Sequence, residues 1–494
     1  MPTVVNLSGN RDIDGILWGY KWDFTTLTYS FPQNVFGWQY SQGIFEFEAF
    51  NATQINAAIR AMRNIDNVCG LNFTQAPNPA DGNIRWGEAT QINYLNQGGI
   101  GWHAPGFNAQ NPSAEANPPD PAFPAYTQGD LWFSKGNYNS PQIGGFAYAA
   151  GIMHELGHAA GLKHGHQTST SHGQNFPTLP PNHDSQEYSV MTYNNSPGRI
   201  ASGNLNLDYP TTFMQNDIAA LQYMYGANYA FNASATTYSW SPTTGETFIN
   251  GVSQGRPFHN KIFLTIWDGG GVDTYNFSNY TTVVVVNLNP GQWSTPSSAQ
   301  KANLGDGIFA RGSIANALLH KNDGRSLIEN ANGGSNNDVI VGNVARNTLN
   351  GNNGNDQLFG GVGNDTLSGG AGADTLAGGT GLDRLTGGAG NDTFLFNAAV
   401  SSTSRDALTD FNVPQDQFKI DNAFFSVTGA VNTILSADQF HRGTAAHDGT
   451  DRIIYNPANG QLIYDSNGTG AGGAVVFATT GLNLSITRAD FIIV

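Results

Sequence analysis

Four histidines and one glutamate lie within thirteen residues, in the stretch HELGHAAGLKHGH that runs from 154 to 166. On a helix, His154 and His158 are four residues apart, so their imidazoles project from one face within reach of a single ion. Glu155 lies about 100° further around the same helix, beside such an ion, where a general base would act on water held by the metal. The spacing therefore predicts a metal centre with hydrolytic chemistry.

A third ligand must come from beyond the end of this helix. If the helix continued, residue 164 would lie roughly 9 Å beyond His158 at the standard rise, too far to share the metal. We therefore expect the helix to break, and Gly161 is suited to a left-handed exit. After such a turn either His164 or His166 can return towards the ion, and geometry alone does not choose. Three neutral imidazoles suit zinc and leave a fourth position for water or substrate.

Glycine and aspartate form the second chemical pattern. Residues 332–394 consist of seven consecutive units of nine residues, from NGGSNNDVI to TGGAGNDTF. Asn347 replaces the aspartate in the unit VGNVARNTL, where we expect incomplete cation occupancy. Aspartates in register repel one another unless a cation neutralises them, and calcium takes six to eight oxygens in flexible geometry. In the other units the aspartate recurs at Asp338, Asp356, Asp365, Asp374, Asp383 and Asp392.

Glycine-bent turns expose carbonyls beside each carboxylate, so glycines and aspartates together form the expected calcium ligands. A further match lies upstream in WDGGGVDTYNF, and Glu329 is placed to close the first site. The remaining candidate ligands are Asp268, Gly270, Gly271, Asp273, Gly334, Asn336, Gly351, Gly360, Gly361, Gly363, Gly369, Gly370, Gly372, Gly378, Gly379, Gly381, Gly387, Gly388 and Gly390.

Each repeat unit should pair a glycine-rich turn with a three-residue strand. One unit buries too little surface to be stable alone, so stability must come from stacking neighbours. We expect one inward-pointing ridge made by Ile340, Leu349, Leu358, Leu367, Leu376, Leu385 and Phe394.

The amino-acid composition limits the kinds of partner that the protein can bind. The chain of 494 residues has a net charge of −16, with only 12% charged residues and 39% hydrophobic ones. The acidic balance argues against nucleic acid or an anionic membrane as partner and favours bound cations. No apolar run is long enough for membrane insertion, and no signal peptide is recognisable at the N-terminus. The single cysteine, Cys69, excludes an intramolecular disulfide and is expected to be a buried hydrophobe.

The elements that must position these residues follow from periodicity. The stretch 52–68 has apolar residues at helical spacing, and a second amphipathic helix, read from NDIAALQYMYGAN, should stop at Gly226. Strands are expected in 26–31, 82–89 and 129–135, and the Pro- and Asn-rich segment 104–128 should be a long surface loop. Helical periodicity nearly vanishes after residue 228, which indicates a domain boundary there.

Several motifs carry a resemblance to known families. The nonapeptides are similar to the calcium-binding repeats of the repeats-in-toxin family, which implies a parallel β-roll. The string H-E-x-x-H-x-x-G-x-x-H is that of the metzincin metalloproteases, whose spacing selects His164 as the third zinc ligand. The stretch EYSVMTYNN resembles their methionine turn, which implies that Met191 lies under the metal. By the same resemblance, Tyr193 binds zinc at rest and stabilises the tetrahedral intermediate.

Nearly the full chain resembles the serralysins, secreted bacterial metzincins with a C-terminal β-roll, because LTYSFP, GDLWF, YSVMTY, DIAALQYMYGAN and ADFIIV occur in the expected order. The resemblance implies an α+β metzincin catalytic domain in 1–228 and an all-β domain in 229–494, combining a parallel β-roll at 332–394 with a β-sandwich. It further implies an uncleaved type I secretion signal at about 440–494, read by an ABC exporter, and an extracellular location.

The expected function is that of a monomeric zinc-dependent endopeptidase, with one catalytic zinc, several structural calcium ions, protein substrates and a proteinaceous inhibitor as a further partner. The competing hypothesis is a calcium-dependent adhesin or surface-layer protein with a vestigial metal site. Such a site need keep neither Glu155 nor Tyr193, and this chain has both. Segment 104–128 lies just ahead of the expected cleft-edge strand near GDLWF and is expected to shape access to the substrate groove.

Overall fold

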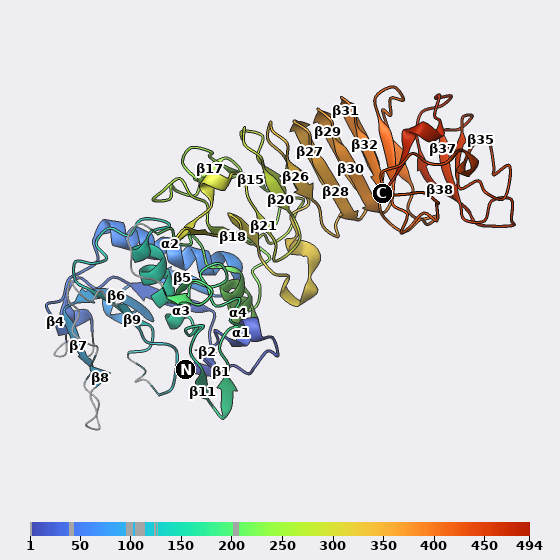
Figure 1. Ribbon diagram of the computed structural model, residues 1–494. Coiled ribbons are helices and arrows are strands. Elements are labelled where there is room, and N and C mark those ends of the chain that lie inside the picture. Colours follow the sequence, from blue (N-terminus) through green and yellow to red (C-terminus); the bar gives the residue numbers. More distant parts are fainter. Residues whose placement is uncertain are drawn as a thin grey trace.

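The computed structural model of the chain describes residues 2–38, 44–94, 102–103, 114–122, 125, 127–200 and 207–494. The molecule is elongated (Figure 1), with the helices gathered at the N-terminal end and a long stack of strands extending from them to the C-terminal end. The described helices are α1 (Arg11–Asp14), α2 (Ala52–Val68), a π-helical stretch (Ala147–Met153), α3 (His154–Ala159) and α4 (Gln215–Tyr225). Short 3₁₀ turns are Val35–Gly37, Pro79–Asp81, Ser298–Gln300, His320–Asn322, Gly324–Ser326, Ala437–Gln439 and Arg488–Asp490.

Two of these helices confirm the expectations from periodicity. α2 begins with a capping box, in which Asn51 accepts from the backbone of Thr53 and Gln54 while the Gln54 side chain accepts from the Asn51 backbone N–H. This reciprocal arrangement satisfies donors at the helix start that have no partner within the helix. α4 ends at Gly226, whose φ of 78° lies in the left-handed half of the map that glycine enters at no steric cost.

A mixed five-stranded sheet lies against α2 and α3, in the order β5 (Asn72–Gln75), β3 (Thr26–Ser30), β6 (Ile84–Ala89), β10 (Asp130–Ser134) and β9 (Ala114–Ala116). The first four strands are parallel, and β9 runs antiparallel to β10. The three strands expected in this part of the chain are thereby confirmed. The edge strand near GDLWF is β9, from within 104–128, which covers the outer side of β10.

That insertion was wrongly expected to be loop throughout, since β9 is paired with β10; its residues 104–113, 123, 124 and 126 lie outside the described part. Small sheets complete this end: β1 (Pro2–Val4) with β2 (Tyr20–Trp22); β4 (Ile44–Phe45), β7 (Gln91–Tyr94) and β8 (Trp102–His103); β11 (Ser169–Ser171) with β12 (Gln174–Phe176); and β13 (Asn194–Ser196) with β14 (Arg199–Ile200).

The C-terminal half is built mainly from two large sheets whose strands alternate along the chain. One has thirteen strands in the order β17 (Val252–Ser253), β16 (Thr247–Ile249), β15 (Thr237–Trp240), β19 (Thr274–Asn276), β25 (Asn330–Asn332), β27 (Thr348–Asn353), β29 (Thr366–Ala371), β31 (Arg384–Ala389), β33 (Asp406–Leu408), β38 (Ala474–Thr479), β37 (Gln461–Asp465), β36 (Ile453–Asn456) and β35 (Phe440–Arg442). The other has seven: β20 (Val285–Asn287), β26 (Val339–Val341), β28 (Gln357–Val362), β30 (Thr375–Thr380), β32 (Thr393–Phe396), β34 (Gln417–Ile420) and β39 (Phe491–Ile493). Minor sheets contain β18 (Leu264–Ile266), β24 (Ile314–Asn316) and β21 (Trp293–Ser294), and β22 (Asn303–Gly305) with β23 (Ile308–Phe309).

Successive nonapeptides fall into opposite sheets, so each strand pairs in parallel with the strand two units later. Leu349 lies beside Leu367 in one sheet, and Leu358 beside Leu376 in the other. The expectation of one apolar ridge is therefore wrong: two ridges face each other, with all seven side chains fully buried in one core. The strands β27 to β31 are six residues long, not three, because pairing resumes beyond the residue skipped after Asn350. This parallel roll of stacked nonapeptides is the expected fold for this half.

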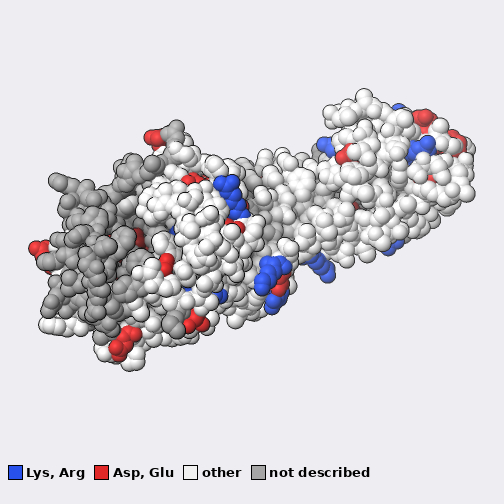
Figure 2. Space-filling model, turned by 90° about the horizontal axis from the view of Figure 1, so that it is seen from below, with Lys and Arg blue, Asp and Glu red and all other residues white. Residues whose placement is uncertain are grey.

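Two apolar cores correspond to the two ends of the molecule. The first is formed mostly by residues 5–224 and also takes in Phe263, Trp267 and Ala302–Ala310, whereas the second runs from Tyr238 to Ile493. The domain boundary at residue 228 stays a prediction. Charged side chains are sparse and scattered on the face that Figure 2 shows. Of the helices in the described residues, none has the length and apolar character needed to cross a membrane.

Candidate metal centre and aspartate ladders

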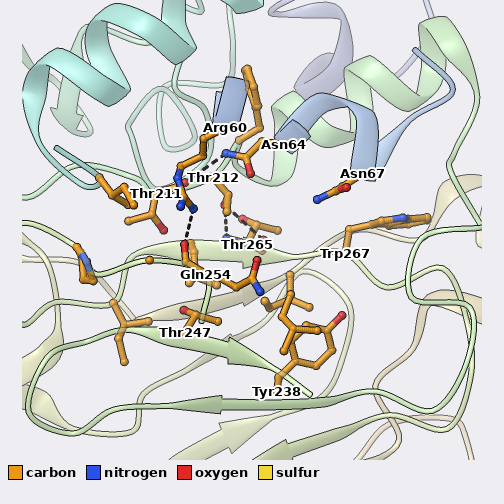
Figure 3. A pocket seen from close by; sticks show the side chains of 18 of the residues that line it. Arg60, Asn64, Asn67, Thr211, Thr212, Tyr238, Thr247, Gln254, Thr265 and Trp267 are labelled. Carbon is orange, nitrogen blue, oxygen red and sulfur yellow. Dashed lines mark hydrogen bonds between the residues drawn. The ribbon is translucent and has the colours of Figure 1, made fainter. Parts of the chain in front are cut away.

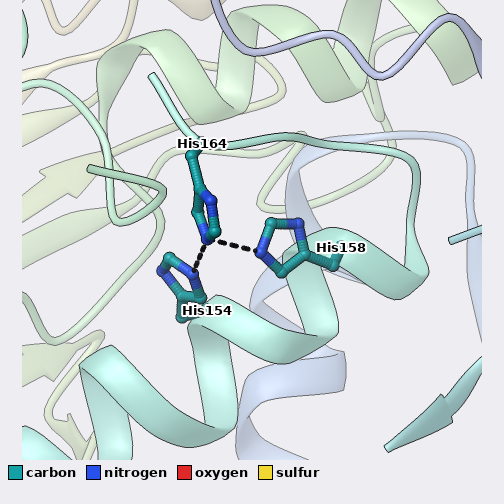
Figure 4. Close-up of side chains that lie close together, drawn as sticks. All are labelled: His154, His158 and His164. Carbon is teal, nitrogen blue, oxygen red and sulfur yellow. Dashed lines mark hydrogen bonds between the residues drawn. The ribbon is translucent and has the colours of Figure 1, made fainter. Parts of the chain in front are cut away.

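The three candidate zinc ligands lie together at the end of α3. His154 and His158 project from this short helix and are almost fully buried, at 3% and 8% exposure. His164 comes back from the chain beyond the helix (Figure 4), and its Nε2 lies 3.0 Å from Nε2 of each of the other two. The structure thus brings together three Nε2 atoms that can bind one ion.

Each of these imidazoles is oriented through its other nitrogen. Nδ1 lies 2.8 Å from the Val190 carbonyl oxygen in His154, 2.8 Å from the Leu162 carbonyl oxygen in His158, and 3.1 Å from Gln167 Oε1 in His164. An oxygen at Nδ1 favours the tautomer with its proton there and leaves the lone pair of Nε2 for a metal. The donor set therefore fits a borderline cation such as zinc.

The chain reverses at Gly161, as the helix geometry predicted. This residue has a φ of 101°, and a side chain there would meet the carbonyl oxygen of Tyr20, its added Cβ lying only 2.6 Å away. The break has a second consequence, because it brings the Leu162 carbonyl to His158. One glycine thus both returns His164 to the site and fixes the orientation of His158.

Burial keeps the three imidazoles neutral. It lowers the pKa of His154 to about 4 and that of His164 to about 3, and it lowers the pKa of His158 well below its usual value, with neighbouring histidines adding to the effect. Neutral imidazole is the form that binds a metal.

Glu155 is 6% exposed on the same helix. Among the described residues, no donor is hydrogen-bonded to its carboxylate. Burial raises its pKa well above the ordinary value, and the carboxylate of Glu115 on β9 raises it further. Sequence spacing could not reveal Glu115, because only the pairing of β9 with β10 brings it near the helix.

Tyr193 lies over the histidine cluster and is 46% exposed. Its ring centre is 4.4 Å from that of His164 and 5.7 Å from that of His154. Burial and Glu155 raise the pKa of its phenol to about 12, so the hydroxyl keeps its proton at neutral pH. His166 is exposed and stacks on the outer side of His164, with ring centres 5.2 Å apart.

Met191 is fully buried against α3, where its sulfur occupies the space that a side chain at Gly157 would need. This turn is held by Asp217 at the start of α4, whose carboxylate accepts from Ser189 Oγ at 2.5 Å, Val190 N at 2.8 Å and Met214 N at 2.9 Å. Because the Val190 carbonyl in turn orients His154, Asp217 positions a candidate metal ligand from another element. Sequence spacing did not reveal this contact.

In the roll, the aspartates form two ladders, one along each sheet. From Asp356 to Asp392, the Oδ1 atom of each repeat aspartate accepts the backbone N–H of the residue eighteen positions earlier, at 2.7–2.9 Å. The second oxygen is different. Oδ2 is buried without a hydrogen bond in Asp356, Asp365, Asp374, Asp383 and Asp392.

These unpaired oxygens face spaces that only glycine leaves open. A side chain at Gly351 would collide with Asp356 Oδ2 and with the Gly369 carbonyl oxygen from the next turn, and the same relation recurs along the ladders at Gly360 and Gly369. Buried acceptors without donors are costly, whereas an ion in such an oxygen-lined space would satisfy them. The residues therefore fit calcium, which prefers oxygen ligands.

Two units differ from the others. Asn347 Oδ1 accepts from Asn343 N, and its Nδ2 donates to the Glu329 carbonyl, so a neutral amide already satisfies that position. Asp338 accepts backbone N–H groups from Val284 and Gly334 on its two oxygens. The incomplete cation occupancy expected at Asn347 has a structural basis in these contacts.

The upstream candidates are also brought together. Glu329 Oε2 accepts from Asp273 N at 2.7 Å, and Asp273 Oδ2 is buried without a partner. Asp268 accepts from Gly270 N and from the Tyr238 hydroxyl. Burial, with the Asp268 charge, raises the pKa of Asp273 to about 8.

The ladders continue beyond the repeat into residues that periodicity missed. Asp416 Oδ1 accepts from Asp392 N at 2.9 Å, and Asp406 Oδ1 accepts from Asp383 N at 3.4 Å. Both keep the repeat's pattern of aspartate two residues before an apolar side chain, but at spacings of 24 and 23. Asp410 contacts the same region by accepting from Gly387 N and Gly388 N.

Without calcium, we expect the roll to lose stability as pH rises from about 4 to about 7. Burial raises the pKa of Asp356 to about 7, and of Asp365 and Asp392 to about 6. Folded-state values above the unfolded ones mean that the native state binds more protons in this window, so the free energy of unfolding falls with pH. Thermal unfolding in a chelator at pH 4.5 and 7.0 tests this, and an unchanged or rising midpoint at pH 7.0 contradicts it.

A separate cavity lies between α2 and the strands that follow α4 (Figure 3). Arg60 and Asn64 point into it from the helix, and the Arg60 guanidinium donates to the Gln254 carbonyl. The described lining contains no histidine, cysteine or carboxylate. The cavity therefore lacks the groups for hydrolysis that the histidine cluster provides.

Comparison with known proteins agrees with this architecture. Residues 227–492 match the family model "Peptidase M10 serralysin C terminal". The chain is 30% identical over 320 residues to "Metallopeptidase AprA" of Pseudomonas marginalis, an alignment that covers 62% of this chain and 57% of that protein. It is 29% identical over 318 residues to "Serralysin" of Photorhabdus luminescens, covering 62% of this chain and 56% of that protein. The chain thus spans less than two thirds of the length of these relatives.

The chain thus combines a parallel β-roll that carries aspartate ladders with a candidate metal centre of three histidines. The family match covers more than half of the chain. The chain therefore belongs to the peptidase M10 serralysin family.

Proposed function

We propose that the protein is a zinc-dependent endopeptidase that is secreted and stabilised by calcium. The observation that carries this proposal is the convergence of the His154, His158 and His164 Nε2 atoms at α3, the helix that also carries the buried carboxylate of Glu155. The names of the relatives, a metallopeptidase and a serralysin, support the same reaction class.

In this proposal the three imidazoles hold zinc and Glu155 is the general base. When bound, zinc supplies Lewis acidity that polarises the scissile carbonyl and lowers the pKa of water. Glu155 takes the proton of the attacking water and passes it to the leaving amine. Its burial near a second carboxylate favours proton uptake, which suits that role.

Tyr193 is proposed to donate a hydrogen bond from its hydroxyl to the oxyanion that forms on the carbonyl, and at rest the same side chain would be a further ligand of the zinc. Its raised pKa keeps the hydroxyl a donor at neutral pH, and its partial exposure leaves room for movement. Met191 supports the ligands from below.

Replacing Tyr193 with phenylalanine should therefore lower kcat by about 10²-fold, the usual effect of losing one oxyanion donor. KM should change much less, because the interaction is made in the transition state. Steady-state kinetics on a fluorogenic peptide measure both constants. Tyr223→Phe, which alters an exposed tyrosine that donates to the Asn6 carbonyl, is the control. Full kcat in Tyr193→Phe would remove the tyrosine from the mechanism.

Calcium is proposed to fill the spaces between the aspartate Oδ2 atoms and the glycine carbonyls and so to order the roll. Low calcium inside the cell and higher calcium outside would then couple folding to export through a type I ABC exporter. In this proposal residues 1–228 form the metzincin catalytic domain and about 440–494 carry the secretion signal. Protein substrates, a proteinaceous inhibitor and a monomeric state belong to the same proposal.

The function is tested by hydrolysis of casein with purified protein in calcium. We expect hydrolysis that a zinc-selective chelator abolishes and that His158→Ala lacks. Hydrolysis by His158→Ala at the wild-type rate would overturn the assignment.

A further inference from the structure

A second group of metal-ligating side chains lies at the opposite end of the molecule from α3, on the edge strand β35 and the loop that follows it (Figure 1). It consists of His441, His447 and Asp451, whose candidate ligand atoms all lie within 4.8 Å of one another. No role in the proposed peptidase involves these residues. We propose that they form a site for a divalent transition metal, such as zinc or cobalt.

The loop that carries two of the ligands is closed by its own hydrogen bonds. Asp451 Oδ2 accepts from His447 N at 2.5 Å and Asp448 N at 3.0 Å. Asp448 Oδ1 accepts from the Thr450 hydroxyl at 2.6 Å and from the Thr450 backbone N–H at 2.8 Å. The backbone of His447 is therefore fixed against the Asp451 carboxylate before any ion binds, which reduces the cost of ordering the site.

The side chains leave donor atoms free on the side where they meet. Asp451 is 4% exposed, and within the described residues no hydrogen bond reaches its Oδ1. The His441 imidazole, likewise, makes no hydrogen bond to a described residue. The rings of His441 and His447 lie almost parallel, 16° apart in plane and 5.4 Å between centres. A half-buried imidazole and a buried carboxylate oxygen, neither hydrogen-bonded to a described residue, thus lie close to a second imidazole, that of His447.

Gly443 leaves the space that this arrangement needs. A side chain at that position would collide with His441 Nε2. The residue does not have a positive φ, so backbone conformation does not require glycine here. Glycine is favoured at position 443 because a larger residue would collide with the imidazole of His441.

The chemistry of the donors selects the metal. Two imidazoles with one carboxylate suit zinc, cobalt or nickel, whereas calcium prefers oxygen ligands alone. His447 is the outer ligand, with a side chain 72% exposed, and Asp448 lies beside it with Oδ2 3.5 Å from His447 Nδ1. Water would complete the coordination from that side. Drawing the ligand atoms to a common metal requires movement mainly of the exposed His447 side chain.

Metal binding at this site would stabilise the end of the thirteen-stranded sheet. β35 is the terminal strand of the thirteen-stranded sheet and pairs in parallel with β36, to which residues 443–452 connect it. A metal held by His441 on the strand and by His447 and Asp451 in the connection would fasten that loop over the sheet edge. Covering an edge in this way protects it from pairing with another chain.

The test is metal stoichiometry of the full chain, saturated with calcium, after equilibration with zinc and removal of free metal. We expect two zinc equivalents in the wild type, and one in His447→Ala and in His441→Ala. His158→Ala should also retain one equivalent, held at the C-terminal site, which separates the two centres. His320→Ala removes a partly exposed histidine elsewhere and should retain two.

Cobalt titration followed by visible absorption gives a second readout, in which one of two sets of bands should vanish with His447→Ala. Unchanged thermal unfolding of that variant in chelator would show that the fold is intact, and His447 is exposed enough for this to be expected. One zinc equivalent in the wild type, or two in both His441→Ala and His447→Ala, would overturn the proposal. Loss of zinc only in His158→Ala would count against this site while leaving the peptidase assignment standing.

Discussion

Replacing Glu155 with glutamine is expected to lower kcat/KM for a peptide substrate by about 10²–10⁴-fold, the usual contribution of a general acid–base group. Glutamine has nearly the same shape and cannot take the proton of the attacking water. The side chain is buried but not hydrogen-bonded within the described residues, so the fold and the three imidazoles should be little disturbed. Steady-state kinetics with zinc content measured on the same sample check this result.

The matched control is Glu246→Gln, which changes a glutamate in the turn between β15 and β16 whose carboxylate accepts from the Ser253 hydroxyl. It should retain wild-type kcat/KM. Glu155→Gln with full zinc and wild-type kinetics would remove the carboxylate from the mechanism. Loss of zinc in that variant would instead assign Glu155 to metal binding.

Removal of calcium is expected to have the largest effect on stability. A single site saturated at 100 times its dissociation constant contributes about 2.7 kcal/mol to the free energy of unfolding. Several sites stacked along the roll should act together, since each turn is stabilised by its neighbours. Circular dichroism in chelator should therefore show loss of the roll's β signal at temperatures where the calcium-loaded protein is fully folded.

Asp374→Asn separates the effect of the ion from that of the fold. Asparagine can keep the Oδ1 acceptor for Asp356 N while replacing the unpaired Oδ2. This variant should be more stable than the wild type in chelator, because a buried charge is removed, and should gain less from calcium. Asp438→Asn, at an exposed carboxylate, should behave as the wild type in both conditions. Equal calcium gains in Asp374→Asn and the wild type would contradict calcium binding at this position.

Local features of the fold were predictable from the sequence. The helix over 52–68 follows from apolar spacing and an asparagine cap, and the helix stop at Gly226 and the reversal at Gly161 follow from glycine's access to positive φ. Helix geometry also predicts that a third histidine returns towards His154 and His158, although it does not choose between His164 and His166. Such signals lie within a few residues of the structure that they determine.

Features that depend on pairing between distant segments were not predictable in the same way. A period of nine does not reveal that successive units alternate between two sheets. Because they alternate, the paired residues are eighteen apart, and two apolar ridges form instead of one. β9 was missed because a three-residue strand in a proline-rich segment has no periodicity to detect. Asp217 and Glu115 reach the centre from other elements, and only the tertiary fold brings them there.

The central claim is that zinc held by the three histidines makes this protein a peptidase. It is tested most directly by preparing the calcium-loaded protein free of zinc and measuring peptide hydrolysis as zinc is added back in small steps. We expect negligible activity at the start, restoration by the zinc that His154, His158 and His164 bind, and no restoration in His158→Ala at any zinc level. Full activity without zinc, or equal restoration in His158→Ala, would contradict it.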